Sequence, residues 1–236
     1  MHIEPVIWDS AFFHLTIGKI NEGVFNRQEF LQEKEVFDLI YIFEKPESNN
    51  NAAISSINAV LVDEKITYKI ILKNEGEMDA AISVYTQDEP NDKLISLTLQ
   101  SGIYSRFKTD KNFPAEAYEK LYITWIKKSC DKSIAFRILI YGEMKNPSGF
   151  ITLTGNGSEA QIGLIAVDEQ HRGKGIGRKL IEAAITTAKN HNFTTLKVVT
   201  QGANQQACLL YEKCGFVIDS KINIYHYWNK KDAYPI

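Results

Sequence analysis

Hydrophobic and polar residues change their spacing several times along the chain, and each change predicts an element. Short apolar or alternating runs typical of strands lie at residues 80–85, 134–141, 149–154, 160–167, 194–200 and 216–228. Helical spacing recurs at residues 90–103, 114–126, 175–191 and 204–214, the first two of which open on a proline. The order β-α-α-β-β-β-α-β-α-β predicts an α/β fold, in which a mixed sheet carries helices on both faces.

A polar stretch at residues 73–77 separates these elements from the first part of the chain. We therefore expect a smaller α/β domain at residues 1–78 and a larger domain at residues 79–236. Residues 39–72 also align without a gap on residues 195–228, because both segments have the pattern strand, turn, short helix, strands. Few residues in this alignment are identical, so the pattern predicts a shared supersecondary unit while chance similarity stays open.

Composition and charge exclude several classes of function. The 236 residues contain 27 Lys and Arg and 29 Asp and Glu, and a net charge of -2 argues against nucleic-acid and membrane partners. No apolar run reaches the length of a membrane span, and the first residues lack a signal-peptide pattern, so we expect a cytoplasmic protein. The three cysteines and five histidines have no metal-site spacing, so no metal is expected.

Residues 167–178, which join a predicted strand to the longest predicted helix, carry the clearest chemical signature. Gly173, Gly175 and Gly177 let the backbone turn tightly, and a helix start offers free N–H groups to an anion. Four cations accompany them: Arg172, Lys174, Arg178 and Lys179. The helix dipole disfavours cations in a first helical turn. Their presence here therefore favours a bound phosphate over a turn that is merely solvated. The Walker and dinucleotide fingerprints are both absent.

The pattern Gln170-x-x-Gly173-x-Gly175, followed by Ile176-Gly177, resembles the acetyl-CoA motif of the GCN5-related N-acetyltransferases. The segment from Asn204 to Phe216 resembles the second motif of that family. The resemblance covers about residues 80–236, and it implies the family fold and acetyl-CoA as cosubstrate. It assigns cofactor contacts to Ile165, Ala166, Val167, Gln170, Arg172, Gly173, Lys174, Gly175, Ile176, Gly177, Arg178 and Asn204. Asn204 has a second interpretation, as the cap of its helix.

The same resemblance implies that Tyr211 protonates the departing CoA thiolate. A thiol has a pKa of ~8.5 and a tyrosine of ~10, so the tyrosine can donate a proton as the thiolate forms. The alternative is a core aromatic residue. Glu143 and Glu159 are candidate general bases only because each follows a predicted sheet strand, and a solvated turn is the competing interpretation.

A narrower resemblance links Ile3-Glu4-Pro5 and Ser105-Arg106-Phe107 to the TDP-fucosamine acetyltransferases. These enzymes acetylate the 4-amine of a TDP-linked 4-amino-4,6-dideoxygalactose for polysaccharide synthesis, and they also carry a smaller N-terminal domain. The resemblance implies a nucleotide-sugar substrate held by Arg106 and Tyr122, and a possible homodimer. Arg106 as a surface residue, and Tyr122 as a core residue, are the alternatives. A protein-amine acetyltransferase and a CoA-binding regulatory module are the competing functions.

Overall fold

A computed structural model describes residues 1–73 and 78–229, so the predicted linker lies outside the described residues except for Lys73. In these residues one sheet of ten strands runs in the order β1-β2-β3-β10-β4-β9-β8-β7-β6-β5. Its strands are β1 (Glu4–Pro5), β2 (Ile17–Ile20), β3 (Leu39–Glu44), β4 (Val60–Ile71), β5 (Ile82–Val84), β6 (Arg137–Glu143), β7 (Asn146–Asn156), β8 (Glu159–Val167), β9 (Thr195–Gln201) and β10 (Val217–Trp228). The β2–β3 and β8–β9 pairs are parallel, so the predicted mixed sheet is confirmed.

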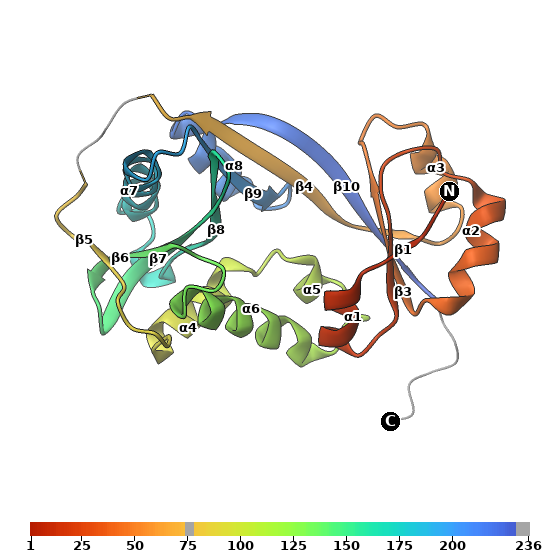
Figure 1. The fold of residues 1–236 in the computed structure, drawn as a ribbon, viewed down its shortest axis with the longest axis horizontal. Helices are drawn as coiled ribbons and strands as arrows, with labels where there is room; N and C mark the ends of the chain where they lie inside the picture. Colours follow the sequence, from red (N-terminus) through yellow and green to blue (C-terminus); the bar gives the residue numbers. More distant parts are fainter. Residues whose placement is uncertain (74–77, 230–236) are drawn as a thin grey trace.

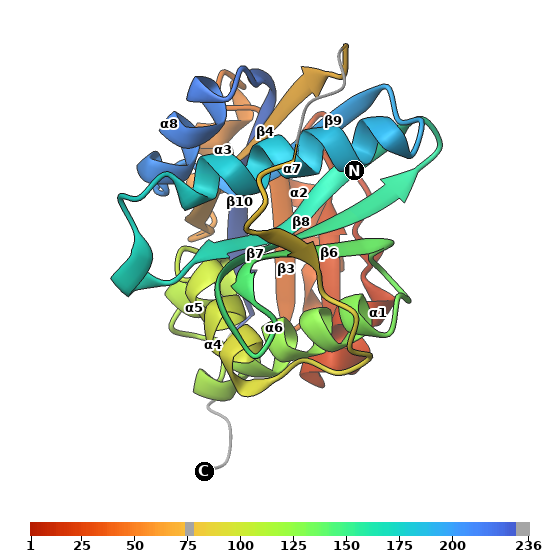
Figure 2. The ribbon, with the colours of Figure 1, turned by 90° about the vertical axis from the view of Figure 1, so that its left-hand side faces the viewer.

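Helices lie on both faces of this sheet (Figures 1 and 2). They are α1 (Ile7–Phe13), α2 (Arg27–Glu33), α3 (Asn50–Ser55), α4 (Asp92–Ser101), α5 (Arg106–Thr109), α6 (Ala115–Cys130), α7 (Ile176–Asn190) and α8 (Gln205–Lys213), with 3-10 turns at Lys34–Val36 and Glu169–His171. The helix predicted over residues 90–103 begins only at Asp92, because the Asn91 side chain caps it by accepting the Leu94 N–H. The single turn α5 has no counterpart in the predicted order, since its four residues are too few for a helical period.

Strands β4 and β10 run side by side from one half of the molecule to the other (Figure 1). Strand β4, from the first part of the chain, pairs with both β9 and β10, while β10, the last strand, pairs with both β3 and β4. The boundary near residue 78 stays a prediction. Whatever the position of this boundary, β4 of the first part pairs with strands of the second part and β10 of the second part pairs with β3 of the first. The two parts therefore form one continuous sheet.

The predicted internal repeat is confirmed, and it has a symmetry that the sequence alone did not show. Elements β3-α3-β4 follow the same course as β9-α8-β10, with equivalent residues 156 positions apart. Equivalent pairs occur on either side of the β4–β10 ladder: Val217 pairs with Lys69 as Tyr225 pairs with Leu61. The two copies are therefore related by an approximate two-fold axis that passes between β4 and β10.

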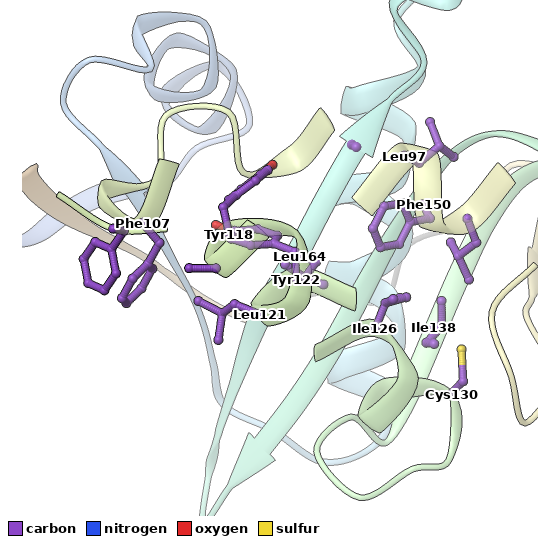
Figure 3. Close-up of a cluster of buried hydrophobic side chains, with 14 of the residues drawn as sticks. Leu97, Phe107, Tyr118, Leu121, Tyr122, Ile126, Cys130, Ile138, Phe150 and Leu164 are labelled. Atoms are coloured by element: carbon purple, nitrogen blue, oxygen red, sulfur yellow. The ribbon is translucent and has the colours of Figure 1, made fainter. Parts of the chain in front are cut away.

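Three clusters of buried side chains follow from this arrangement. One cluster lies under α7 and α8 and contains Leu180, Leu196 and Tyr211, and its counterpart under α2 and α3 contains Phe30 and Ile40. On the opposite face, a third cluster joins α4 and α6 to strands β6, β7 and β8 (Figure 3). Strands β2 and β3 of the first part of the chain contribute to it as well. Its members include Leu121 and Ile126 of α6, which lie in the helix predicted over residues 114–126.

Candidate active site

Strands β8 and β9 pair along the first part of β8 and then diverge. Their parallel pairing runs only from Glu159 to Ile162 on β8, although β8 continues to Val167. A bulge starts the divergence, because Gly163 and Leu164 stand opposite the single residue Thr152 of β7. The Thr152 hydroxyl accepts the Leu164 N–H at 2.8 Å and holds the bulge in place. The gap that opens beyond it leaves the β9-facing edge of β8 free to pair with an extended ligand.

The Gly-rich loop closes one end of this gap. Gly173 and Gly175 both have φ of +77°, and a Cβ added at either would meet no atom within 4 Å. Left-handed backbone explains glycine at both positions, and the open space beside them admits a ligand to the N–H groups that begin α7. Gly177 has a different role, because a Cβ there would lie 3.0 Å from Leu210 of α8, so glycine lets α8 pack closely against α7.

Polar contacts fix the conformation of this loop. The buried Asp168 carboxylate accepts the Gln170 N–H at 2.9 Å and forms an ion pair with Lys93 of α4. The side-chain hydrogen bond from Lys93 is the main cause that lowers the pKa of Asp168, so this carboxylate stays ionised. The Arg172 guanidinium bonds the Val167 carbonyl at 3.2 Å and the Gln100 side chain at 3.4 Å. Arg172 is thereby held at the mouth of the gap.

A cavity of about 350 Å³ lies between the loop, β8, α4 and α8. Most of the residues predicted to contact the cofactor line it: Ile165, Ala166, Val167, Arg172, Gly173, Gly175, Ile176, Gly177, Arg178 and Asn204. Gln170 and Lys174 belong to the same loop but do not line the cavity. Its free backbone groups, glycine cradle and cations match a long ligand with a pyrophosphate, so the residues present fit acetyl-CoA.

Tyr211 lies on α8 with 3% of its surface exposed, and it lines this cavity as well as a second one. Its ring packs 5.7 Å from that of Tyr68 and 5.9 Å from that of Phe216, measured between centroids. Burial raises the pKa of the phenol, which therefore keeps its proton at neutral pH. Asn204 caps α8 by accepting the Ala207 N–H at 3.2 Å, as one of its two interpretations predicted.

The second cavity, of about 410 Å³, adjoins the first and shares Ile165, Asn204, Ala207 and Tyr211 with it. Arg106 and Tyr122, the two residues predicted to contact the substrate, both line it. The Arg106 guanidinium lies over the rings of Tyr41 and Phe107, at 4.9 and 4.6 Å from their centroids. Its buried Nε atom has no hydrogen-bond partner within the described residues. An unpaired buried donor is costly and points to a ligand.

Residues of the first part of the chain also line the second cavity, and sequence reasoning missed them. Asp63 and Lys65 of β4 and Phe43 of β3 form its wall beside Arg106. Burial raises the pKa of Asp63 to about 6, against the opposing influence of Arg106 and Lys65. The alternation of β4 places Asp63 and Lys65 on one face, but only the strand order of the whole sheet brings that face to the cavity.

Glu143 and Glu159, the candidate bases, do not line either cavity. Glu159 forms an ion pair with Lys197 at 2.9 Å, and Glu143 lies exposed beside the β6–β7 turn. Across residues 1–73 and 78–229, no three His, Cys, Asp or Glu side chains gather as metal ligands. Within that part of the chain, no helix has the length and hydropathy to cross a bilayer.

Comparisons with known proteins agree with this geometry. The chain is 24% identical over 226 residues to the dTDP-fucosamine acetyltransferase of Escherichia coli, which covers 92% of this chain and 94% of that protein. It is 26% identical over 149 residues to the spore coat polysaccharide biosynthesis protein SpsD of Bacillus subtilis, covering 61% of this chain and half of that protein. A structure of a conserved protein of unknown function from Staphylococcus epidermidis has the same fold, with a TM-score of 0.60, 16% identity and coverage of 90% and 84%.

The model of the acetyltransferase (GNAT) family matches residues 101–216. This range contains the bulged strand β8, the Gly-rich loop, α7 and α8. Because this model spans most of the elements that form the first cavity, residues 101–216 belong to the acetyltransferase (GNAT) family, whose fold uses acetyl-CoA, and the protein is an N-acetyltransferase.

Proposed function

We propose that the protein transfers the acetyl group of acetyl-CoA to the 4-amine of a TDP-linked 4-amino-4,6-dideoxyhexose, with the galacto epimer favoured. The similarity to dTDP-fucosamine acetyltransferase extends over nearly the full length of both chains, including the N-terminal part. The similarity to a polysaccharide biosynthesis protein supports the same class of substrate.

The observation that carries the proposal is the second cavity, which meets the first at Tyr211 and is lined by Arg106, whose buried Nε atom has no partner among the described residues. A guanidinium binds pyrophosphate through paired hydrogen bonds, and Lys65 adds a second positive charge. Tyr122 and Trp125 offer aromatic faces for a nucleobase. Among the described residues Asp63 is the only carboxylate on its wall, so the cavity is not an acidic groove of the kind that a basic peptide needs.

The reaction then uses the meeting point of the two cavities. The acceptor nitrogen attacks the thioester carbon, and the C–S bond breaks as the C–N bond forms. Tyr211 gives its proton to the leaving thiolate, for which its raised pKa keeps that proton available. Backbone N–H groups on the edge of β8 that no longer pairs with β9 beyond Ile162 stabilise the thioester oxygen as negative charge develops on it.

The decisive experiment compares the free amino sugar with its TDP-linked form. Binding energy from a remote nucleotide orients the amine, so the linked form should be preferred in kcat/KM by more than ~100-fold, or about 2.7 kcal/mol. Arg106→Ala and Arg106→Lys should both remove much of this preference and leave acetyl-CoA affinity unchanged. Lys108→Ala is the matched control, because Lys108 lies on the same helix α5 and lines neither cavity.

Equal use of the free sugar, or faster acetylation of a basic peptide, would contradict the proposal. In the second case the protein-amine alternative would replace it. A lack of CoA release with every amine of a TDP- and UDP-amino-sugar panel would instead favour a regulatory module.

A further inference from the structure

Asp63 stands in an unusual place for a carboxylate. It lies on β4, in the middle of the ten-stranded sheet, and its Oδ1 atom is buried without a hydrogen-bond partner among the described residues. It lines the second cavity together with Tyr211, Asn204 and Ile165, the residues at which that cavity meets the first. Unpaired carboxylate oxygens are rarely kept buried, because their desolvation costs more than that of a neutral group.

The internal repeat supplies a direct comparison. The equivalent of Asp63 in the second copy is Asp219, 156 residues later on β10. Asp219 forms ion pairs with Lys69 at 2.5 Å and with Lys197 at 3.7 Å, and these contacts lower its pKa. The same position thus carries a neutralised aspartate on the outside of one copy and an unpaired aspartate beside the cavity in the other.

We propose that Asp63 receives the ammonium group of the acceptor and takes up its proton before the attack on the thioester. This inference rests on the proposed function, in that the acceptor is a small primary amine in the second cavity. It makes the first part of the chain a contributor to the active site, and it supplies the proton acceptor that Glu143 and Glu159 do not provide.

The protons balance in this scheme. The ammonium group R–NH₃⁺ gives one proton to the Asp63 carboxylate, and the neutral amine forms the C–N bond as the C–S bond breaks. Tyr211 protonates the CoA thiolate and regains a proton from the acetylated nitrogen. Asp63 releases its proton to solvent with the product. The sum is an amide, CoA thiol and one proton in solution, and no further reactant is required.

The charges around Asp63 are compatible with this role. Burial raises its pKa to about 6, and Arg106 of α5 and Lys65 of β4 oppose the rise while Glu64 of β4 adds to it. Tyr122 of α6 also faces the carboxylate, and burial keeps the phenol neutral. A carboxyl group with this pKa is ionised at neutral pH, yet it is a stronger base than an ordinary aspartate.

The test compares Asp63→Asn with Asp219→Asn, using TDP-4-amino-4,6-dideoxy-D-galactose as acceptor. For the wild type, kcat/KM should fall as the pH drops below about 6, because the protonated carboxyl group accepts no proton. Asp63→Asn should lower kcat/KM by ~10²–10⁴-fold near neutral pH and abolish this decrease of kcat/KM at acid pH. Asp63→Glu should restore part of the rate. Asp219→Asn should keep both the wild-type kcat/KM and its decrease at acid pH. All variants should bind acetyl-CoA with wild-type affinity.

Failure of the inference and failure of the proposed function give different results. If the wild type acetylates the TDP sugar and Asp63→Asn retains both kcat/KM and its decrease at acid pH, the role of Asp63 is overturned while the proposed function stands. If the wild type does not use the TDP sugar, ¹³C NMR of the Asp63 carboxyl carbon in the acetyl-CoA complex decides instead. Added cyclohexylammonium should move its titration to lower pH, and an unchanged titration would overturn the inference.

Discussion

The two copies of the internal repeat share a backbone course but differ in the loop that leads into each. In the second copy, the Gly-rich basic loop precedes the 15-residue helix α7 and borders a cavity of about 350 Å³. At the equivalent place in the first copy, residues 21–26 precede the seven-residue helix α2. The cavity there, of about 270 Å³, is lined by Glu4, Glu22 and Glu44 and, within residues 1–73 and 78–229, by no Lys or Arg. Its charge has the wrong sign for a pyrophosphate.

The difference shows which part of the fold carries which task. The shared strand-helix-strand unit builds the sheet, and the loop before it decides whether the cavity accepts an anion. The first copy lacks the Gly-rich basic loop but contributes its strand β4 to the second cavity, which Asp63 and Lys65 line. In the proposed reaction, one copy provides the acetyl donor site and both provide the acceptor site.

Deletion of the first copy of the repeat should have the largest effect on the solubility and activity of the enzyme. A variant that begins at residue 80 lacks β4, so β9 and β10 lose the strand that joins them. Exposed apolar edges favour association, and we expect aggregation and complete loss of acetyl transfer. Size-exclusion chromatography and a thiol-release assay measure both effects. A soluble and fully active truncation would show that the second copy is self-sufficient.

Tyr211→Phe separates chemistry from binding within the second copy. Loss of the hydroxyl should lower kcat by ~10²–10⁴-fold, while acetyl-CoA affinity measured by calorimetry barely changes. Tyr68→Phe is the matched control, because the Tyr68 ring packs against that of Tyr211 but its hydroxyl bonds Glu212 and it lines neither cavity. Turnover of Tyr211→Phe within about threefold of wild type would make Tyr211 a core residue only.

An added negative charge tests the two loops against each other. Gly175→Asp and Arg172→Glu should weaken acetyl-CoA binding at least ~10-fold, since a lost charged hydrogen bond costs ~1.5–3 kcal/mol. Gly23→Asp places the same charge in the equivalent loop, where a Cβ meets no atom within 4 Å, and should leave the affinity unchanged. Calorimetry on folded variants measures all three, and equal affinities throughout would remove the Gly-rich loop from the cofactor site.

The residues predicted for the donor side lie close together in the structure, because their sequence signals are local, and their role stays a prediction. Gly173 and Gly175, the cations beside them and the strand and helix around them all lie within a short stretch, and the structure brings most of them to one cavity. Arg106 and Tyr122 also reach the second cavity as the resemblance implied. The helix boundaries moved by one or two residues where a capping side chain such as Asn91 set them.

The acceptor wall on β4 was not predictable in the same way. Asp63 lies 148 residues before Tyr211, and it reaches the cavity only because β4 inserts between β9 and β10. A pattern of alternating residues defines the face of a strand but not its neighbours in the sheet. The repeat gave the one available signal, since Asp63 and Asp219 align and, among the described residues, only Asp219 forms ion pairs with lysines.

The positions of β4 and β10 in the sheet also determine when the sheet can be completed during synthesis. Strands β3 and β4 leave the ribosome early, but the strand that must fill the space between them, β10, is the last of the sheet. At ~5–20 residues per second, β3 and β4 wait on the order of ten seconds for their common neighbour. During that interval their facing edges are unpaired, and contacts this distant in sequence form slowly. The sheet is therefore completed only once its final strand, β10, has been synthesised.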